Sequence, residues 1–384
     1  MNFSIQPNEI AGFIHFFSST TPEQKDVWLD KYPELKTTNF ENLITLMAEN
    51  KKKSGPSISD SMLHDFIDKI NNLDDLKKVL DGYPGKDIDI NKMKQTLDSI
   101  WPIYDKFYQE QASKLNSMSD QATQFMNKET VKPLENVAKF YNYKVPQDYT
   151  ISTYLYPVAT AEKDPHQRGG RNRKSGVFIW FSDNLLKKDN PKVPFSTIFH
   201  EATHNIFSKS GEADKSLDYE TENSPVVHFF ETHPEQKHNP KDSAKGSSVW
   251  LLNETLTTAF QGIFERDILK QKRESLYANP AINIMAHRMI PVLETALKNG
   301  ETFGPEFMKK FEKEFEAALP EIEKEITPKQ EKSPIMARLS EAANKGKDDP
   351  RNQVNATQEN TEKKPIFPKW LQNPSWLWHS NKQK

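Results

Sequence analysis

The hydrophobic pattern of the first 130 residues is mostly helical. Four apolar residues after Pro7 recur at the three- and four-residue spacing of one helix face: Ile10, Phe13, Ile14 and Phe17. The sequence Thr21-Pro22-Glu23-Gln24 resembles a capping box and predicts another helix start. A longer apolar stripe runs over 93–125, and Pro102 within it predicts a kink or a break. We therefore expect a helical N-terminal region over 1–130, whose stripes form core or an interdomain face.

The pattern becomes typical of β-structure near residue 145. Residues 149–156 alternate and are rich in branched and aromatic side chains, which predicts a strand. A second strand is expected over 176–181. Between them, residues 168–174 are mainly Arg and Gly and indicate a flexible basic loop. Such a loop is usually only solvated, and contact with an acidic substrate or partner is the alternative.

Helical spacing returns after Pro194 and continues to about residue 325. Helices are expected over 249–270, over 280–299 with Gly300 as the C-terminal stop, and over 305–318. Pro320 marks the expected end of the last helix.

The remaining chain is poor in apolar residues, and we expect a largely disordered tail over 326–384. Near its end it carries three tryptophans, Trp370, Trp376 and Trp378. This aromatic segment either folds back onto the body or docks onto a protein partner or membrane surface. The chain is thus divided into a helical region over 1–130, a catalytic domain over 131–325 and the tail.

The amino-acid composition excludes several kinds of partner and of chemical site. The 384 residues include 52 Lys and Arg against 54 Asp and Glu, so no overall positive charge favours nucleic acid as a partner. Cysteine is absent, which excludes disulfides, iron–sulfur clusters and cysteine nucleophiles, so a metal must be held by His, Asp or Glu. The N-terminus does not resemble a signal peptide, and no apolar run approaches the roughly 18 residues of a membrane span. We expect a cytoplasmic protein, or one exported without a cleavable signal peptide.

The motif His-Glu-x-x-His at 200–204 carries the clearest chemical signal. On a helix, His200 and His204 project from one face and can bind one Zn²⁺ together. Glu201 lies about 100° round the helix, within reach of a metal-bound water, which suits a general base. A separate apolar stripe would hold this helix against a sheet: Phe195, Phe199, Ala202 and Ile206. The alternative is an ordinary amphipathic helix with two hydrogen-bonded histidines.

With this motif, residues 150–300 resemble the zincin metallopeptidases. The resemblance implies an α+β catalytic domain, with a small sheet beside the active-site helix and a helical subdomain after it. The strand over Val177–Phe181 would be the edge strand that pairs with the substrate backbone. The metzincin branch needs a third His six residues after the second, and Ser210 occupies that position.

The gluzincin branch takes its third ligand from a Glu on a second helix, and residues 249–260 are similar to that helix. The resemblance makes Glu254 the third zinc ligand, although a surface Glu on a core helix is the alternative. Two features depart from the family. Residues 205–253 form an unusually long insertion, and Thr258 stands where several gluzincins have an Asp that orients a ligand His. We expect the hydroxyl of Thr257 or Thr258, or a backbone carbonyl, to replace it.

The insertion offers competing ligands. Residues 211–214 partly match the aspzincin signature, which makes Asp214 the alternative third ligand. His228, His233 and His238 recur every five residues, which fits no single helix face. We interpret this segment as a polar loop that forms a flap over the cleft, and a second metal site is the alternative.

The gluzincin resemblance also implies a donor that stabilises the oxyanion, supplied by a Tyr or His after the second helix. The catalytic candidates are Tyr277 and His287, with Arg288 beside them. Nothing resembles the nucleophile elbow of a Ser-His-Asp hydrolase or a phosphate-binding loop.

Together these features predict a zinc-dependent peptidase that binds one Zn²⁺ and cleaves a peptide or protein substrate, with Glu201 as general base. The alternative is a zincin scaffold without activity that acts by binding other proteins. A bacterial effector delivered by specialised secretion and a cytosolic housekeeping enzyme both suit the sequence.

Overall fold

The computed structural model describes residues 1–20, 22–54, 67–82, 89–159, 168–173, 176–182, 192–219, 224–238 and 241–326. The chain divides into two units, Met1–Thr327 and Pro328–Lys384. The described residues all belong to the first unit, so the predicted boundary at 130/131 falls inside one unit. The aromatic C-terminal segment lies outside the described residues.

One four-stranded sheet lies in this unit, in the order β1-β2-β4-β3. Its strands are β1 (Asn2–Pro7), β2 (Thr150–Val158), β3 (Arg168–Arg173) and β4 (Gly176–Ser182). The first three in spatial order are parallel, and β3 is antiparallel to β4. In register, Asn2 pairs with Thr150, and Thr153 with Val177. The strands expected over 149–156 and 176–181 are confirmed as β2 and β4.

Two strands were not expected. β1 lies in the region expected to be helical, and only Phe3 and Ile5 alternate inward on it. Two buried positions are too few to identify a strand, and its partner lies about 150 positions later. The loop expected over 168–174 is wrong over its first six residues, which form β3. Its Arg and Gly residues have little intrinsic β-propensity, so pairing with β4 supplies the strand conformation.

Several of the N-terminal helices pack against a long helix, α6. The elements are α1 (Glu9–Ser19), α2 (Pro22–Lys31), η1 (Pro33–Thr37), α3 (Phe40–Ser54), η2 (Ile67–Lys69), α5 (Leu73–Asp81), α6 (Ile90–Phe125), the π-helical η3 (Met126–Thr130) and α7 (Val131–Phe140). α2 starts at Pro22 as predicted. Of the kink or break expected at Pro102, the break is wrong, because α6 continues through this residue. Pro102 is exposed, and the buried stripe of Leu97, Ile100 and Tyr104 continues past it.

The C-terminal part is helical as expected. Its elements are α9 (Lys192–Ser210), α10 (Glu212–Tyr219), α11 (Pro225–Thr232), η4 (Pro234–Gln236), α12 (Ala244–Asp267), α13 (Pro280–Asn299) and α14 (Pro305–Ile326). α13 stops at Gly300, whose φ of 69° is the left-handed conformation that glycine favours. The end expected at Pro320 is wrong, because buried Ala318 and Ile322 carry the apolar stripe of α14 beyond it.

The insertion over 205–253 contains helices, and the polar loop expected around His228, His233 and His238 begins as helix α11. The described part of the insertion contains α10 and α11, which pack against α12 and α14. Buried Val226, Phe229 and Phe230 give α11 an apolar face, which explains why this segment is ordered as a helix.

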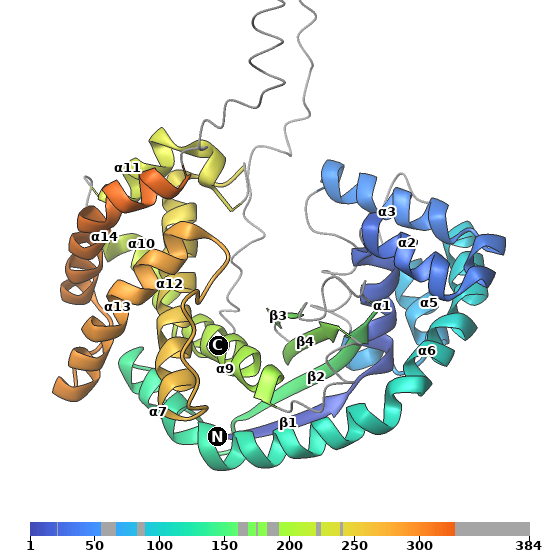
Figure 1. Cartoon of the computed structure of the whole chain (residues 1–384), viewed down its shortest axis with the longest axis horizontal. Helices are drawn as coiled ribbons and strands as arrows, with labels where there is room; N and C mark the ends of the chain where they lie inside the picture. Colours follow the sequence, from blue (N-terminus) through green and yellow to red (C-terminus); the bar gives the residue numbers. More distant parts are fainter. Residues whose placement is uncertain are drawn as a thin grey trace, which may run out of the picture. The chain divides into compact units, whose positions relative to one another are not determined.

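Helix α9 lies between the sheet and α12 (Figure 1). It packs on one side against β3 and β4 and on the other against α12, whereas α6 packs against β1 and β2. The described chain is thus mostly helical with a small sheet, which is compatible with the α+β class expected. Within the described ranges, each helix is too short or too polar to cross a bilayer. The arrangement places one face of α9 directly opposite α12.

Candidate metal centre

The packing of α9 aims its polar residues at α12. The apolar stripe expected on α9 is buried throughout: Phe195, Phe199, Ala202 and Ile206. Phe199 stacks on Phe264 of α12 with ring centroids 4.2 Å apart and nearly parallel planes. This contact fixes the rotation of α9 about its axis, so His200 and His204 meet α12.

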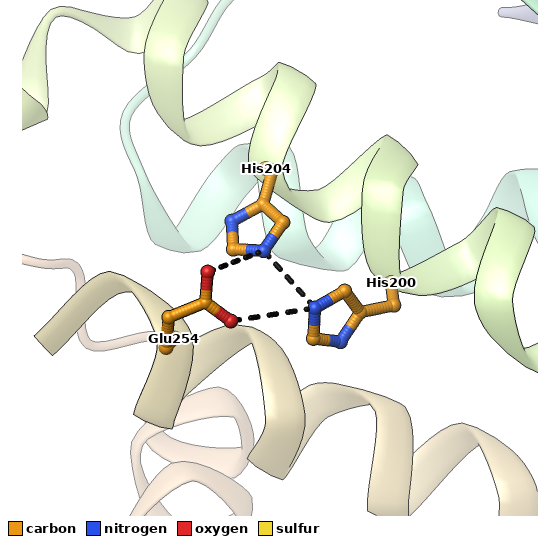
Figure 2. Close-up of side chains that lie close together, drawn as sticks. All are labelled: His200, His204 and Glu254. Carbon is orange, nitrogen blue, oxygen red and sulfur yellow. Dashed lines mark hydrogen bonds and ion pairs between the residues drawn. The ribbon is translucent and has the colours of Figure 1, made fainter. Parts of the chain in front are cut away.

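Three ligand atoms converge between these helices (Figure 2). The Nε2 atoms of His200 and His204 lie 3.0 Å apart. The carboxylate of Glu254 lies 3.6 Å from His200 Nε2 through Oε2 and 3.5 Å from His204 Nε2 through Oε1. Their side chains are only 10–16% exposed. In the described part of the chain, no other group of three His, Asp or Glu residues is arranged to hold a metal ion.

The hydrogen bonds of the two imidazoles leave their inner nitrogens free to bind a cation. His200 Nδ1 lies 2.9 Å from Gln261 Oε1, and His204 Nδ1 lies 3.0 Å from Asn253 Oδ1. An amide oxygen only accepts, so the network assigns the hydrogen of each ring to Nδ1. When both rings are neutral, the lone pairs of the two Nε2 atoms face each other across 3.0 Å. They lie beside a buried Glu254 Oε2 that has no hydrogen-bond partner among the described residues. A cation satisfies all three atoms at once.

The separations of the ligand atoms also fit a metal ion. Tetrahedral coordination with zinc–ligand bonds of about 2.0–2.1 Å places neighbouring ligand atoms about 3.3–3.4 Å apart. The two Nε2 atoms lie 3.0 Å apart, and each lies 3.5–3.6 Å from one of the two oxygens of the Glu254 carboxylate, so these separations lie around that value. His200, His204 and Glu254 can therefore hold one ion with little movement.

The electrostatics of the site favour positive charge. Burial alone would lower the pKa of His204, but the charge of Glu254 and a hydrogen bond to it raise that pKa to about 9. Burial would likewise raise the pKa of Glu254, but the positive charge of His204 and contacts with both imidazoles hold it well below its usual range. Glu254 is thus ionised at neutral pH, the form in which a carboxylate binds metal.

Glu201 lies beside the ligand atoms and is not one of them. Its side chain is buried against β3, where a Cβ placed on Gly170 would lie 2.7 Å from Glu201 Oε1. Its negative charge contributes to the raised pKa values of His204 and Tyr277. Glu201 therefore lies between strand β3 and the group formed by His204 and Tyr277, on whose pKa values its charge acts.

Tyr277 reaches the same centre from the connection between α12 and α13. Its ring stacks on His200, with centroids 6.3 Å apart and planes inclined by 25°. Burial raises the pKa of Tyr277, and the charge of Glu254 and a hydrogen bond to it raise it further. The phenol therefore stays protonated at neutral pH and can donate a hydrogen bond.

The other two oxyanion candidates lie elsewhere. His287 is exposed on α13, and its Nε2 donates to the backbone oxygen of Glu274 at 3.0 Å. Arg288 forms ion pairs with Glu314 and Glu321 of α14, at 3.8 and 3.5 Å. The structure does not bring either residue to the three ligand atoms.

Further expectations from the sequence need correction or fall outside the description. The strand over Val177–Phe181 is not an edge strand, because β4 lies between β2 and β3, and β3 forms the edge. Asp214 lies in α10, but its side chain is outside the described ones.

The three histidines of the insertion are dispersed. His228 pairs with Glu231 at 3.7 Å, His233 stacks on Phe229, and His238 stacks on Trp250. In the described residues, they form no second metal-binding group.

Two residues that orient the histidines were missed in the sequence. Thr257 Oγ1 lies 3.3 Å from His204 Nδ1, as expected of a threonine hydroxyl, whereas the hydroxyl of Thr258 is buried without a partner. Asn253 and Gln261, the closer partners, were not anticipated. Asn253, Thr257 and Gln261 are spaced by four, so they share one face of α12 opposite the His200–His204 face of α9. This matching spacing is the signal that could have identified them.

Comparison of the chain with protein-family models, with curated proteins and with solved structures finds no match.

Proposed function

We propose that the protein is a zinc-dependent peptidase. The observation that carries the proposal is the convergence of His200, His204 and Glu254, in which the buried Oε2 of Glu254 has no hydrogen-bond donor among the described residues. Two imidazoles and one carboxylate are the ligand set of open catalytic zinc sites, and the chain has no thiolate to favour a closed structural site.

Each residue around the centre has a role in hydrolysis. A bound zinc ion would act as a Lewis acid on the substrate carbonyl and would lower the pKa of water. Glu201 accepts the proton of the attacking water and passes it to the leaving amine. The hydroxyl of Tyr277 donates to the negative oxygen that develops on the carbonyl. Asn253 and Gln261 hold the imidazoles in the tautomer that binds metal.

The surrounding elements support a zincin-like arrangement in this proposal. α9 lies beside the sheet and α12 supplies the third ligand, as in the gluzincins. The edge strand available to pair with a substrate backbone is β3 and not Val177–Phe181. β3 lies against Glu201 at Gly170. An extended peptide that added to this edge would run past the general base.

Elemental analysis and a peptide-library screen test the proposal. We expect one zinc per chain and cleavage that a chelator abolishes. Glu201→Gln should retain zinc while turnover falls by at least about 10²–10⁴-fold, the contribution of a general base. His204→Ala should lose zinc.

His228→Ala is the matched control, because the His228 side chain is exposed and pairs with Glu231 at 3.7 Å, away from the three ligand residues. It should keep both zinc and activity. Retention of zinc by His204→Ala would refute the ligand assignment. Zinc binding without cleavage of any library peptide would instead support a binding module built on a zincin-like scaffold.

A further inference from the structure

A second buried carboxylate lies on α12 behind the metal centre. Glu265 is 1% exposed and is not a metal ligand in the proposal above. It accepts hydrogen bonds from the hydroxyl of Ser196 on α9, from Gln261 Nε2 at 2.9 Å and from Arg273 Nε at 2.7 Å. A buried carboxylate with this many donors has a fixed orientation, so it can fix the groups that bind it.

One set of these bonds leads to His200. Gln261 Nε2 donates both to Glu265 and to Ser196 Oγ. Because the amino end of the amide is held there, its oxygen is turned toward His200 Nδ1, at 2.9 Å. Glu265 thereby sets the direction of the Gln261 amide and, through it, the ring of His200 that must present Nε2 to the metal.

The other bond leads to Tyr277. Arg273 lies in the connection between α12 and α13, and its Nη2 donates to the backbone oxygen of Leu276 at 3.4 Å. The same connection is held from α13, where Asn283 Oδ1 accepts from the backbone N–H of Leu276 at 2.8 Å and of Tyr277 at 3.3 Å. The bond from His287 to Glu274 is a third attachment. The carboxylate of Glu265 is thus a side-chain attachment of this connection to α12, in addition to the backbone bond from Gln271 N–H to the Glu265 backbone oxygen at 2.9 Å.

We infer that Glu265 is a positioning residue that holds His200 and Tyr277 in place together. This inference rests on the proposed function, because Tyr277 and His200 matter jointly only at a metal centre. Removal of the carboxylate would leave Arg273 without its partner and would free the Gln261 amide to rotate. Two parts of the site, from different elements, would then lose their orientation in one substitution.

Three variants separate the two sets of bonds. Gln261→Met removes only the partner of His200, Arg273→Gln removes only the attachment of the connection, and Glu265→Gln weakens both. Zinc affinity, measured by competition with a chromophoric chelator, reports on His200. The rate of trypsin cleavage after exposed Lys270 and Lys272, followed by mass spectrometry, reports on the connection.

The expected results differ for each variant. Gln261→Met should weaken zinc binding about 10–100-fold, as loss of a group that orients a ligand does, and should leave the cleavage rate unchanged. Arg273→Gln should raise the cleavage rate roughly tenfold, because local opening becomes more populated, with unchanged zinc affinity. Glu265→Gln should show both effects, and Arg273→Lys should restore the wild-type cleavage rate.

Arg266→Gln is the matched control. Arg266 also bridges carboxylates, Asp267 and Glu294, but on the exposed side of α12. It should change neither zinc affinity nor cleavage.

The inference is overturned if Glu265→Gln folds with wild-type zinc affinity and a wild-type cleavage rate. It is also overturned if cleavage rises equally at sites throughout the protein, which would indicate general destabilisation. If Glu265→Gln does not fold, Gln261→Met and Arg273→Gln still test the inference, because each removes one set of hydrogen bonds. Wild-type zinc affinity in the first and a wild-type cleavage rate in the second would then overturn it. A wild-type protein that binds no zinc contradicts the proposed function, whereas the trypsin comparison still decides whether Glu265 holds the connection.

Discussion

Among the single residues, Glu9 has an unusual ionisation. It lies in the first turn of α1, half-buried beside Asp105 of α6. Burial, a hydrogen bond with Asp105 and the charge of Asp105 raise the pKa of Glu9 to about 7. In the unfolded chain this carboxyl has its ordinary pKa, near 4.5. The folded protein therefore binds a proton at Glu9 more tightly than the unfolded chain does.

The sign of the resulting pH dependence follows from linkage. The stabilisation that protonated Glu9 provides is complete below about pH 4.5 and is lost as the pH rises to about 7. Glu9→Gln should remove this loss, so the variant should be more stable than wild type at pH 8 by on the order of 1 kcal/mol, after allowance for solvent screening. Urea unfolding of both proteins at pH 5 and pH 8 measures the difference in their free energies of unfolding. An equal difference between variant and wild type at both pH values would contradict the assignment.

Tyr141 offers a second test on a single side chain. Its hydroxyl is fully buried among the rings of Phe207, Phe260 and Phe303 and has no hydrogen-bond partner in the described part of the chain. An unsatisfied buried hydroxyl destabilises a fold by about 1–3 kcal/mol. Tyr141→Phe should therefore raise the free energy of unfolding by about 1 kcal/mol in urea titrations. Tyr143→Phe, at a partly buried position nearby, is the control and should change the free energy of unfolding less. If Tyr141→Phe is destabilised instead, a polar group or a water molecule reaches the Tyr141 hydroxyl.

The residues of the site divide into those that a local motif reveals and those that it does not. His200, Glu201 and His204 are adjacent in sequence, so the spacing of one helix suffices to bring them together. Gln261 and Asn253 could not be assigned in the same way, because their roles depend on how α12 faces α9. From the sequence, Tyr277 and His287 were equally good candidates for the oxyanion donor. The structure distinguishes them, because the connection after α12 brings Tyr277 against His200, whereas His287 bonds to the backbone of Glu274.

Helix α9 and strand β3 together define the space around Glu201. A Cβ on Gly170 would lie 2.5 Å from Glu201 Cγ, far closer than such atoms approach, so the strand allows only glycine beside this carboxylate. Gly170→Ala should displace the Glu201 side chain and lower turnover by about 10²-fold, the effect of a displacement of about 1 Å. Zinc content should stay at the wild-type level.

Gly304→Ala is the control for this substitution, because nothing lies within 4 Å of its added Cβ. Its turnover should match that of wild type. Full activity of Gly170→Ala would show that Glu201 has another position available and would weaken its role as general base.

At the scale of elements, the sequence was sufficient where one segment carries its own pattern. β2, β4, the start of α2 and the end of α13 each rest on local residues. Elements that depend on distant partners were misjudged. β1 and β3 gain their strand conformation from β2 and β4, and α6 and α14 pass Pro102 and Pro320 because tertiary burial outweighs the local effect of proline.

At the scale of the whole described unit, the metal centre joins two parts of the chain. His200 and His204 belong to α9, which packs on the sheet, and Glu254 belongs to α12, which packs on α11 and α13. Zinc bound between them would add a cross-link that the unfolded chain lacks. Metal should therefore stabilise the fold as a whole, besides any role in catalysis.

Thermal unfolding tests this coupling. With free zinc at 100 times its dissociation constant, the folded state should gain about 2.7 kcal/mol. The midpoint should rise with zinc concentration in wild type and in His228→Ala, but not in His204→Ala. An equal rise in all three would mean that zinc binds elsewhere.

The parallel pairing of β1 with β2 has a consequence for biosynthesis. Asn2 meets Thr150, so the first strand of the sheet must wait for a partner made about 150 positions later. At 5–20 residues per second, translation takes roughly 10–30 s to reach it. During that time Phe3 and Ile5 have no strand to join, which leaves the nascent chain open to capture by a chaperone. The sheet on which α9 rests can therefore assemble only late, after most of the helices of the N-terminal region have left the ribosome.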